Sequence, residues 1–332
     1  MKFTDIRGFG ERTTADEVLD GIDLTGKSAI ITGASSGIGI ETARALARAG
    51  VAVTLAVRNT TAGERVAADI RESTDDDRVR VAELHLDDIA SIEALVSAWE
   101  KPLDILVNNA AVMASPESYT AGGWESQFAT NHMGHFALAV GLHDALAASG
   151  SARIVSVASS ANNDSPVVFE DLFFARRPYD PSRAYGQSKT ANVLFAVEAT
   201  RRWADAGITA NACMPGGIWT GLQKYWDPDL LAREKERAMD VVKTPAQGAA
   251  TSVLLATAPE LAGVGGRYFE DCHEADVVPE IVDGLHGVRA WALDPVAADR
   301  LWDVSTALLD AERRRLHLVP ASATATQARR RR

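Results

Sequence analysis

The chain alternates short apolar runs with longer segments in which apolar positions recur every three or four residues. The apolar runs predict strands over residues 28–32, 51–57, 79–84, 103–107, 153–157, 208–212 and 266–269. The recurring positions predict helices over residues 38–49, 61–72, 88–99, 124–148 and 182–206. Strands that are apolar throughout are typical of a parallel sheet covered on both faces. We therefore expect an α/β fold with one doubly wound, mostly parallel seven-stranded sheet and helices on both faces.

The two ends of the chain differ from this regular part. Residues 1–25 form a predicted N-terminal extension, in which Thr14 and Glu17 have the spacing of a capping box and predict one or two helical turns. Residues 26–317 form the predicted α/β domain. Residues 318–332 lack hydrophobic periodicity and end in four arginines, which predicts a disordered basic tail.

Composition and charge exclude several function classes. The 332 residues are 46% hydrophobic and 24% charged, as in ordinary soluble globular proteins. The net charge of −11 argues against a nucleic-acid binder, which needs a basic surface. No apolar run reaches the roughly 20 residues that span a bilayer, and the N-terminus lacks the apolar core of a signal peptide. Cys213 and Cys272 are not spaced as a metal site or a disulfide framework, so we expect no metal and a reducing, cytoplasmic environment.

A glycine-rich loop connects the first predicted strand to the first predicted helix. Gly33 allows a tight turn, Gly37 allows the backbone to approach a pyrophosphate, and Gly39 allows the helix to pack closely on the strand. The N-terminus of the helix offers free N–H groups and a positive dipole end to phosphates. This context predicts a dinucleotide site whose loop contacts are Gly33, Ser35, Ser36, Gly37, Ile38 and Gly39.

The end of the second predicted strand indicates which dinucleotide binds. A carboxylate there would accept hydrogen bonds from the ribose of NAD and repel the 2′-phosphate of NADP. The chain instead has Arg58 and Asn59, and the Arg58 guanidinium suits a 2′-phosphate, so NADP is favoured over NAD. Asp87, after the third strand, is a candidate for the adenine amino group or for the N-cap of the next helix, a role for which Asp88 competes.

Two further strand ends carry candidate cofactor contacts. Asn108, Asn109 and Ala110 follow the fourth strand, where an adenosine pocket would be lined. The turn after the sixth strand exposes backbone N–H groups that could hold a carboxamide, and its candidate residues are Pro215, Gly216, Ile218 and Thr220.

The candidate catalytic residues come from three elements. Tyr185 and Lys189 are four residues apart on a predicted helix, so they share one face. A nearby ammonium favours the phenolate, so we expect Lys189 to lower the tyrosine pKa from about 10 and allow Tyr185 to exchange protons with a substrate oxygen. Lys189 could also reach the nicotinamide ribose. Ser159, which ends the fifth strand and has Ser160 as its rival, could hold the substrate oxygen, and Asn131 could relay protons to Lys189.

These motifs together resemble the short-chain dehydrogenases/reductases of the non-extended branch. The Thr-Gly-x-x-x-Gly-x-Gly spacing of residues 32–39 is typical of that branch, and the resemblance covers roughly residues 27–310. Residues 56–59, 131–136 and 266–272 are most similar to the retinol-dehydrogenase-like and WW-domain-oxidoreductase-like group. The chain departs from the family pattern at Ala111, where glycine is usual.

The resemblance implies a Rossmann-type domain with NADP as cofactor and a defined set of site residues. It implies a catalytic tetrad of Asn131, Ser159, Tyr185 and Lys189. It also implies that Asp87 and Asn108 lie around the adenosine, and that Ile218 and Thr220 lie near the carboxamide. The expected activity is NADP(H)-dependent interconversion of a carbonyl and an alcohol on a hydrophobic small molecule, with Tyr185 as the general acid/base.

Several alternatives stay open. Phe173, Phe174, Trp219, Tyr225 and Trp226 could line a pocket for an apolar or ring-containing substrate, or belong to ordinary core. The segment 160–184 could pack as a small subdomain or line the substrate entrance. A homo-oligomer, dimer or tetramer, could form through the helices 124–148 and 182–206. An NADP-binding sensor or scaffold without turnover, and a C=C or C=N reductase on the same fold, are the alternative functions.

Overall fold

A twisted sheet forms the centre of the protein. The computed structural model describes residues 2–237 and 242–317. Within these residues an eight-stranded sheet has the order β3-β2-β1-β4-β5-β6-β7-β8. The strands are β1 (Ser28–Thr32), β2 (Ala52–Val57), β3 (Arg80–Glu83), β4 (Ile105–Asn108), β5 (Ala152–Val157), β6 (Ile208–Met214), β7 (Tyr268–Glu270) and β8 (His273–Glu274).

The topology confirms the doubly wound, mostly parallel sheet. The first seven strands are parallel, and β8 adds an antiparallel edge strand that the sequence pattern did not predict. A separate pair, β9 (Val277–Val278) and β10 (Val288–Arg289), was not predicted either. β1 pairs with both β2 and β4, so the strand order reverses there and leaves a crevice at the carboxyl ends.

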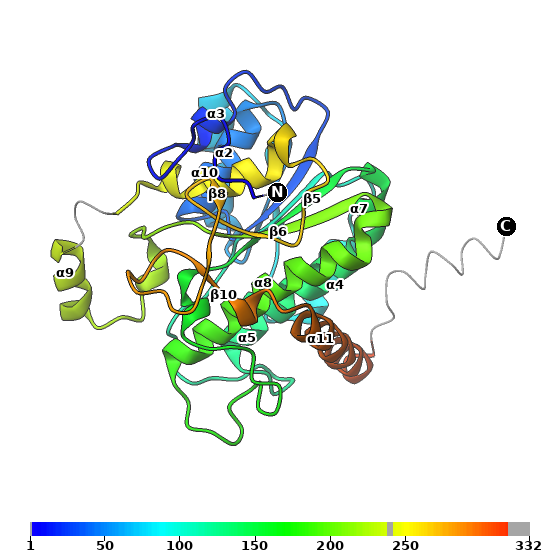
Figure 1. Ribbon diagram of the computed structural model, residues 1–332. Helices are drawn as coiled ribbons and strands as arrows, with labels where there is room; N and C mark the ends of the chain where they lie inside the picture. Colours follow the sequence, from blue (N-terminus) through cyan, green and yellow to red (C-terminus); the bar gives the residue numbers. More distant parts are fainter. Residues whose placement is uncertain (1, 238–241, 318–332) are drawn as a thin grey trace.

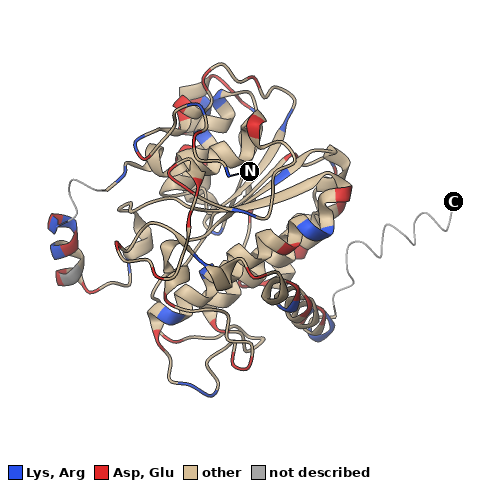
Figure 2. Ribbon diagram, in the orientation of Figure 1, with Lys and Arg blue, Asp and Glu red and all other residues tan. Residues whose placement is uncertain are grey.

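Helices cover both faces of the sheet (Figure 1). One layer contains α1 (Ala15–Val18), α2 (Ile38–Arg48), α3 (Thr60–Thr74) and α10 (Pro245–Thr257). The other contains α4 (Ile89–Ser97), α8 (Pro181–Trp203), α11 (Pro295–Arg315) and the segments between residues 126 and 149. α9 (Pro228–Arg237) lies apart from both layers and carries charges of both signs (Figure 2). No helix in the described part of the chain has the length and apolarity that crossing a bilayer requires.

The single helix predicted over residues 124–148 is wrong. The segment contains α5 (Ser126–Phe128), the π-helix η1 (Ala129–Met133), α6 (Gly134–Gly141) and α7 (His143–Ser149). A Cβ atom at Gly134 would lie 2.1 Å from the carbonyl oxygen of Leu86, so the chain packs there against the β3–α4 connection. The α-helical geometry ends again at Leu142, where ψ is 4°. The π-helical turn carries Asn131, in keeping with the frequent occurrence of such turns at functional sites.

Residues 2–25 pack on the α2–α10 layer. Ile6, Val18 and Leu19 are buried in the core cluster of that layer. The capping box is present, because the Thr14 side chain accepts from the Glu17 N–H and the Glu17 carboxylate accepts from the Thr14 N–H. The predicted tail at 318–332 lies outside the described residues.

The C-terminal helix α11 covers α8. Trp302 of α11 meets Phe136 and Trp203 at ring-centroid distances of 5.0 Å each and stacks on Phe195 at 6.1 Å. The guanidinium of Arg313 forms a buried ion pair with Glu93 of α4. Between residues 184 and 200 no residue of α8 is exposed. The oligomer interface predicted through 182–206 is therefore not available along this stretch, because α11 and the sheet already bury it.

Trp302→Ala should destabilise the protein by about 3–5 kcal/mol, since the substitution empties a site among packed aromatic rings. Urea denaturation followed by circular dichroism measures this loss. Val296→Ala on the same helix, at a side chain that is 75% exposed, should change the free energy of unfolding by less than about 0.5 kcal/mol. Equal effects of the two variants would contradict the role assigned to the aromatic contact.

Candidate active site

A cavity of about 580 Å³ opens at the carboxyl ends of the parallel strands. Loops after β1, β2, β3, β4, β5 and β6 line it together with the N-terminal half of α8. The structure thus brings together most residues predicted from the sequence, namely Gly33, Ser35, Ser36, Gly37, Ile38, Arg58, Asn59, Asp87, Asn109, Ala110, Ser159, Tyr185, Lys189, Pro215, Gly216, Ile218 and Thr220.

The glycine loop forms a cradle suited to phosphate groups. Gly33 has a φ of +68°, and a Cβ atom on it would lie 2.8 Å from Ala110. Gly37, with a φ of +61°, is the N-cap of α2 and places no side chain on the first N–H groups of that helix. Gly39 does not line the cavity, because it packs against Asn109 and the Gly33 carbonyl instead. The open amides and the helix dipole fit a pyrophosphate.

The end of the cavity that is predicted to take an adenosine is lined by residues that follow β2 and β3. Arg58 is exposed and Asn59 caps α3 by accepting a hydrogen bond from the Ala62 N–H at 3.0 Å. Asp88 caps α4 by accepting from the Ala90 N–H at 2.9 Å, which assigns the capping role to Asp88 and leaves Asp87 in the cavity wall. His85 also lines this end and was missed, although its position in the loop after β3 is a usable signal.

The loop after β4 is held by the last residue of β1. The Thr32 hydroxyl accepts hydrogen bonds from the N–H groups of Asn109 and Ala110, both at 2.9 Å, and the Asn109 amide donates to the Thr32 carbonyl at 2.7 Å. Asn108 is only 1% exposed and does not line the cavity. The prediction that Asn108 lines the adenosine pocket is wrong, because as the last strand residue it shares the buried face of Leu106.

Three side chains converge on the middle of the cavity. Tyr185 and Lys189 come from α8, and Ser159 lies in the loop after β5. The Ser159 hydroxyl acts to lower the pKa of Tyr185, which distinguishes Ser159 from its rival Ser160. The Lys189 ammonium lies 5.6 Å from the centroid of the Tyr185 ring and donates to the Val157 carbonyl at 2.8 Å.

Burial dominates the electrostatics of this group. It raises the pKa of Tyr185 to about 12, with the Ser159 hydrogen bond opposing the shift and Asp164 adding to it. Burial also lowers the pKa of Lys189 to about 7. The expectation that Lys189 lowers the pKa of Tyr185 is therefore wrong for the protein alone, since removal of both groups from water disfavours both charged forms. The phenol keeps its proton at neutral pH.

Asn131 has a supporting place behind the cavity. Its amide accepts from the Val112 N–H at 2.8 Å and donates to the Val112 carbonyl and the Ser188 hydroxyl, each at 2.9 Å. Its backbone carbonyl accepts from Nδ1 of His135 at 2.9 Å, and Nε2 of His135 bonds the Thr32 hydroxyl at 2.8 Å. Asn131 thus fixes the wall residue Val112, and a proton relay from Asn131 to Lys189 stays a prediction.

The side of the cavity that is predicted to take the substrate is more polar than expected. Of the aromatic candidates only Tyr225 lines it, while additional wall residues are Val112, Met113, Ser115, Ser118, Ser126, Thr130, Leu222, Gln223 and Lys224. Trp219 and Trp226 pack edge to face on each other, Phe173 packs on Phe128, and Phe174 packs on Tyr179. These four aromatic residues belong to local packing, because ring contacts within the chain occupy them.

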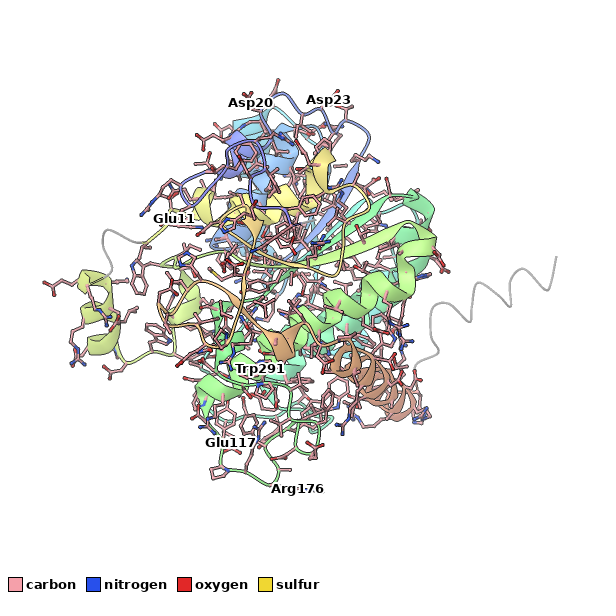
Figure 3. The ribbon with its side chains drawn as sticks, viewed as in Figure 1. Glu11, Asp20, Asp23, Glu117, Arg176 and Trp291 are labelled. Carbon is pink, nitrogen blue, oxygen red and sulfur yellow. The ribbon has the colours of Figure 1, made fainter. Side chains whose placement is uncertain are left out.

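The segment 160–184 packs as a small subdomain. Only Ser160 of this segment lines the cavity. The Tyr179 hydroxyl donates to the Ser115 carbonyl at 3.0 Å, which ties the segment to the loop before α5. Glu117 and Arg176 mark these two loops at one end of the molecule (Figure 3). The subdomain therefore supports the substrate wall from behind.

The geometry agrees with the comparison to known protein families. A family model described as short chain dehydrogenase matches residues 27–231. The chain belongs to this family. As a short-chain dehydrogenase it is an oxidoreductase. The predicted Rossmann-type α/β fold and the predicted similarity to retinol-dehydrogenase-like members are confirmed.

The relatives extend over nearly the whole chain. A probable oxidoreductase of Streptomyces antibioticus is 52% identical over 298 residues, which cover 87% of this chain and all of that protein. Human retinol dehydrogenase 12 is 40% identical over 291 residues, covering 87% of this chain and 88% of that protein. A crystal structure of an uncharacterized protein from Mycobacterium paratuberculosis has a TM-score of 0.69 at 32% identity and covers 90% of this chain and 98% of that one.

Acid should destabilise this protein through its two buried histidines. Burial lowers the pKa of His132 to about 3 and that of His135 to about 4, against an ordinary value of 6.5. Between pH 6.5 and 4 the unfolded chain binds protons that the folded chain does not, so stability falls as pH falls. Each histidine contributes a slope approaching about 1.4 kcal/mol per pH unit.

Denaturant titrations of the wild type and of His132→Gln across this pH window measure the slope. The variant should lose one of the two contributions, because glutamine can keep a hydrogen bond to Ser305, the present partner of His132 at 2.9 Å, without titrating. Identical slopes would show that the His132 ring does not resist protonation.

Proposed function

We propose that this short-chain dehydrogenase uses NADP(H) to interconvert a carbonyl group and an alcohol on a small molecule. The observation that carries the proposal is the convergence of Tyr185, Ser159 and Lys189 in the same cavity as the open N-terminus of α2. The first set suits proton exchange with an oxygen, and the second suits a dinucleotide phosphate. Neither set by itself would select this reaction.

The cofactor assignment rests on charge. The amides at the start of α2 would hold the pyrophosphate, and the exposed guanidinium of Arg58 would pair with a 2′-phosphate. Asp87 would face the adenosine, the loop at residues 215–220 would hold the carboxamide, and Lys189 would reach the ribose. When bound, the cofactor would supply or accept the hydride.

The proton is handled by Tyr185. Because burial keeps the phenol neutral, its Oη can donate a proton to a carbonyl oxygen that becomes an alkoxide on reduction. The Ser159 hydroxyl would hold the same oxygen and the phenol together. Lys189, whose pKa is about 7, would gain or lose a proton readily at neutral pH after each turnover. The protonation states of the protein alone therefore favour carbonyl reduction, a ketoreductase activity.

The substrate is proposed to be a small molecule with an apolar part. Val112, Met113, Leu222 and Tyr225 supply apolar surface beside the catalytic group. The Ser159–Tyr185 pair favours a reacting oxygen over a C=C or C=N bond, since two hydroxyl groups converge on one acceptor. A sensor that binds NADP without turnover would show no NADPH oxidation with any member of a diverse ketone and aldehyde panel. The cytoplasmic location and the homo-oligomer stay predictions.

Tyr185→Phe should lower kcat roughly 10²–10⁴-fold because the substitution removes the proton donor. NADPH binding should be retained, since phenylalanine keeps the ring. Steady-state NADPH oxidation with the best carbonyl of the panel measures the loss, and fluorescence titration measures binding. Tyr119→Phe makes the same change at a side chain that is 45% exposed and should leave both quantities unchanged. Turnover by Tyr185→Phe at the wild-type rate would refute the assignment.

Arg58→Met should weaken NADPH binding roughly 10–100-fold because it removes a charge-assisted contact to the 2′-phosphate. NADH binding should stay unchanged, since NADH has no such phosphate. Calorimetric titration with both cofactors separates the two. Arg300→Met on α11, whose side chain is 54% exposed, serves as the control. Equal weakening of NADPH and NADH would assign Arg58 to another part of the site.

A further inference from the structure

A lysine lies directly beneath the loop proposed to hold the carboxamide. Gly216 has a φ of +101°, and a Cβ atom on it would lie 2.7 Å from Cδ and 2.8 Å from Cε of Lys243. The Lys243 N–H donates to the Gly217 carbonyl at 2.9 Å. The cavity wall continues after Gly217 up to Tyr225, and Lys243 is not part of it. The side chain and the backbone of Lys243 therefore both contact the loop, on the side away from the cavity.

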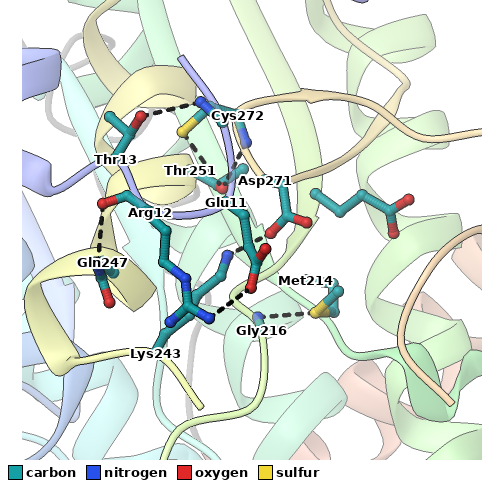
Figure 4. A network of polar contacts seen from close by, with 12 residues as sticks. Glu11, Arg12, Thr13, Met214, Gly216, Lys243, Gln247, Thr251, Asp271 and Cys272 are labelled. Carbon is teal, nitrogen blue, oxygen red and sulfur yellow. Dashed lines mark hydrogen bonds and ion pairs between the residues drawn. The ribbon is translucent and has the colours of Figure 1, made fainter. Parts of the chain in front are cut away.

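The Lys243 ammonium is tied to the sheet by a buried ion pair. It bonds the carboxylate of Asp271, and the two side chains are only 4% and 7% exposed (Figure 4). Asp271 follows β7 directly and has a φ of +47°, a strained conformation for a residue with a side chain. Its second oxygen accepts from Nε2 of His286 at 3.0 Å. The pair thus connects the cavity loop after β6 to the end of the neighbouring strand β7.

The contact between His286 and Asp271 keeps the Asp271 carboxylate in place. His286 also bonds Asp283 through Nδ1 at 2.6 Å, and the Gly287 N–H donates to both oxygens of Glu270 at 3.0 and 2.9 Å. Asp271 is therefore held on both sides, by Lys243 and by this loop. A buried carboxylate without its cationic partner is strongly unfavourable, so the lysine is held in one position.

We propose that Lys243 and Asp271 are positioning residues that hold the loop at residues 215–217 in the conformation that binds the nicotinamide end of the cofactor. The inference rests on the proposed use of NADP(H). Neither side chain touches the reacting atoms. The pair acts through Gly216 and Gly217, whose backbone it supports from below, so that binding requires little further ordering of the loop.

Comparing the binding of two ligands distinguishes a positioning role of Lys243 and Asp271 from a merely structural role. NADPH occupies both ends of the site, whereas adenosine 2′,5′-bisphosphate occupies only the adenosine end. In the full-length protein, Lys243→Met should raise the Kd for NADPH about tenfold through loss of preorganisation and leave the Kd for adenosine 2′,5′-bisphosphate unchanged. Arg58→Met should weaken both ligands, which makes it the matched contrast.

The measurement is calorimetric titration at a temperature where circular dichroism shows each variant to be folded. Asp271→Asn keeps a hydrogen-bond acceptor for Lys243 and provides a milder variant if Lys243→Met does not fold. It should weaken NADPH binding about threefold without affecting the bisphosphate, because the ion pair is reduced to a hydrogen bond from the ammonium to a neutral amide oxygen.

Three results would overturn the inference. The first is wild-type affinity for NADPH in both variants. The second is an equal loss of NADPH and bisphosphate affinity, which would indicate a general loosening of the fold. A wild-type protein that binds neither ligand would refute the proposed cofactor itself, and it differs from the other two outcomes because no variant is involved.

Discussion

The hydroxyl of Thr32 connects the loops at the carboxyl ends of β1 and β4. The whole site depends on this connection. The hydroxyl accepts hydrogen bonds from two N–H groups of the loop after β4 and bonds Nε2 of His135. Because the parallel sheet reverses its order between β1 and β4, this contact joins the two loops that border the crevice. His135 continues the connection to the carbonyl of Asn131. One buried hydroxyl thus sets the relative positions of the glycine loop, the cavity wall and the π-helical turn.

Burial away from water sets the pKa values of Tyr185 and Lys189 in this cavity. Tyr185 and Lys189 are brought close enough for an electrostatic interaction, yet burial is the largest cause of the pKa shift of each. A low-dielectric cavity disfavours the phenolate and the ammonium alike. The result is a phenol that holds its proton and a lysine whose pKa lies near neutrality. Such a pair suits the delivery of a proton to a developing alkoxide better than the removal of one from an alcohol.

Elements beyond the region matched by the family model support the site from outside. The match ends at residue 231, whereas Lys243, Asp271 and α11 follow it. α11 seals the layer that contains α8, and α8 carries Tyr185 and Lys189. Lys243 and Asp271 connect the end of β7 with the loop after β6. The candidate catalytic side chains therefore depend on C-terminal segments that do not themselves line the cavity.

Local residue patterns were enough to predict the βα alternation, the glycine loop and the Tyr185–Lys189 spacing, because each depends on neighbours within a few residues. Folding places a turn at Leu142 within the helix predicted over 124–148, and it packs Gly134 against Leu86, far along the chain. Folding also decided that Asn108 turns away from the cavity and that burial outweighs the charge of Lys189 in setting the pKa of Tyr185. Local residue patterns likewise did not predict the pairing of Lys243 with Asp271, which are 28 residues apart. Burial and long-range contact are properties of the packed chain, and periodicity along the sequence does not encode them.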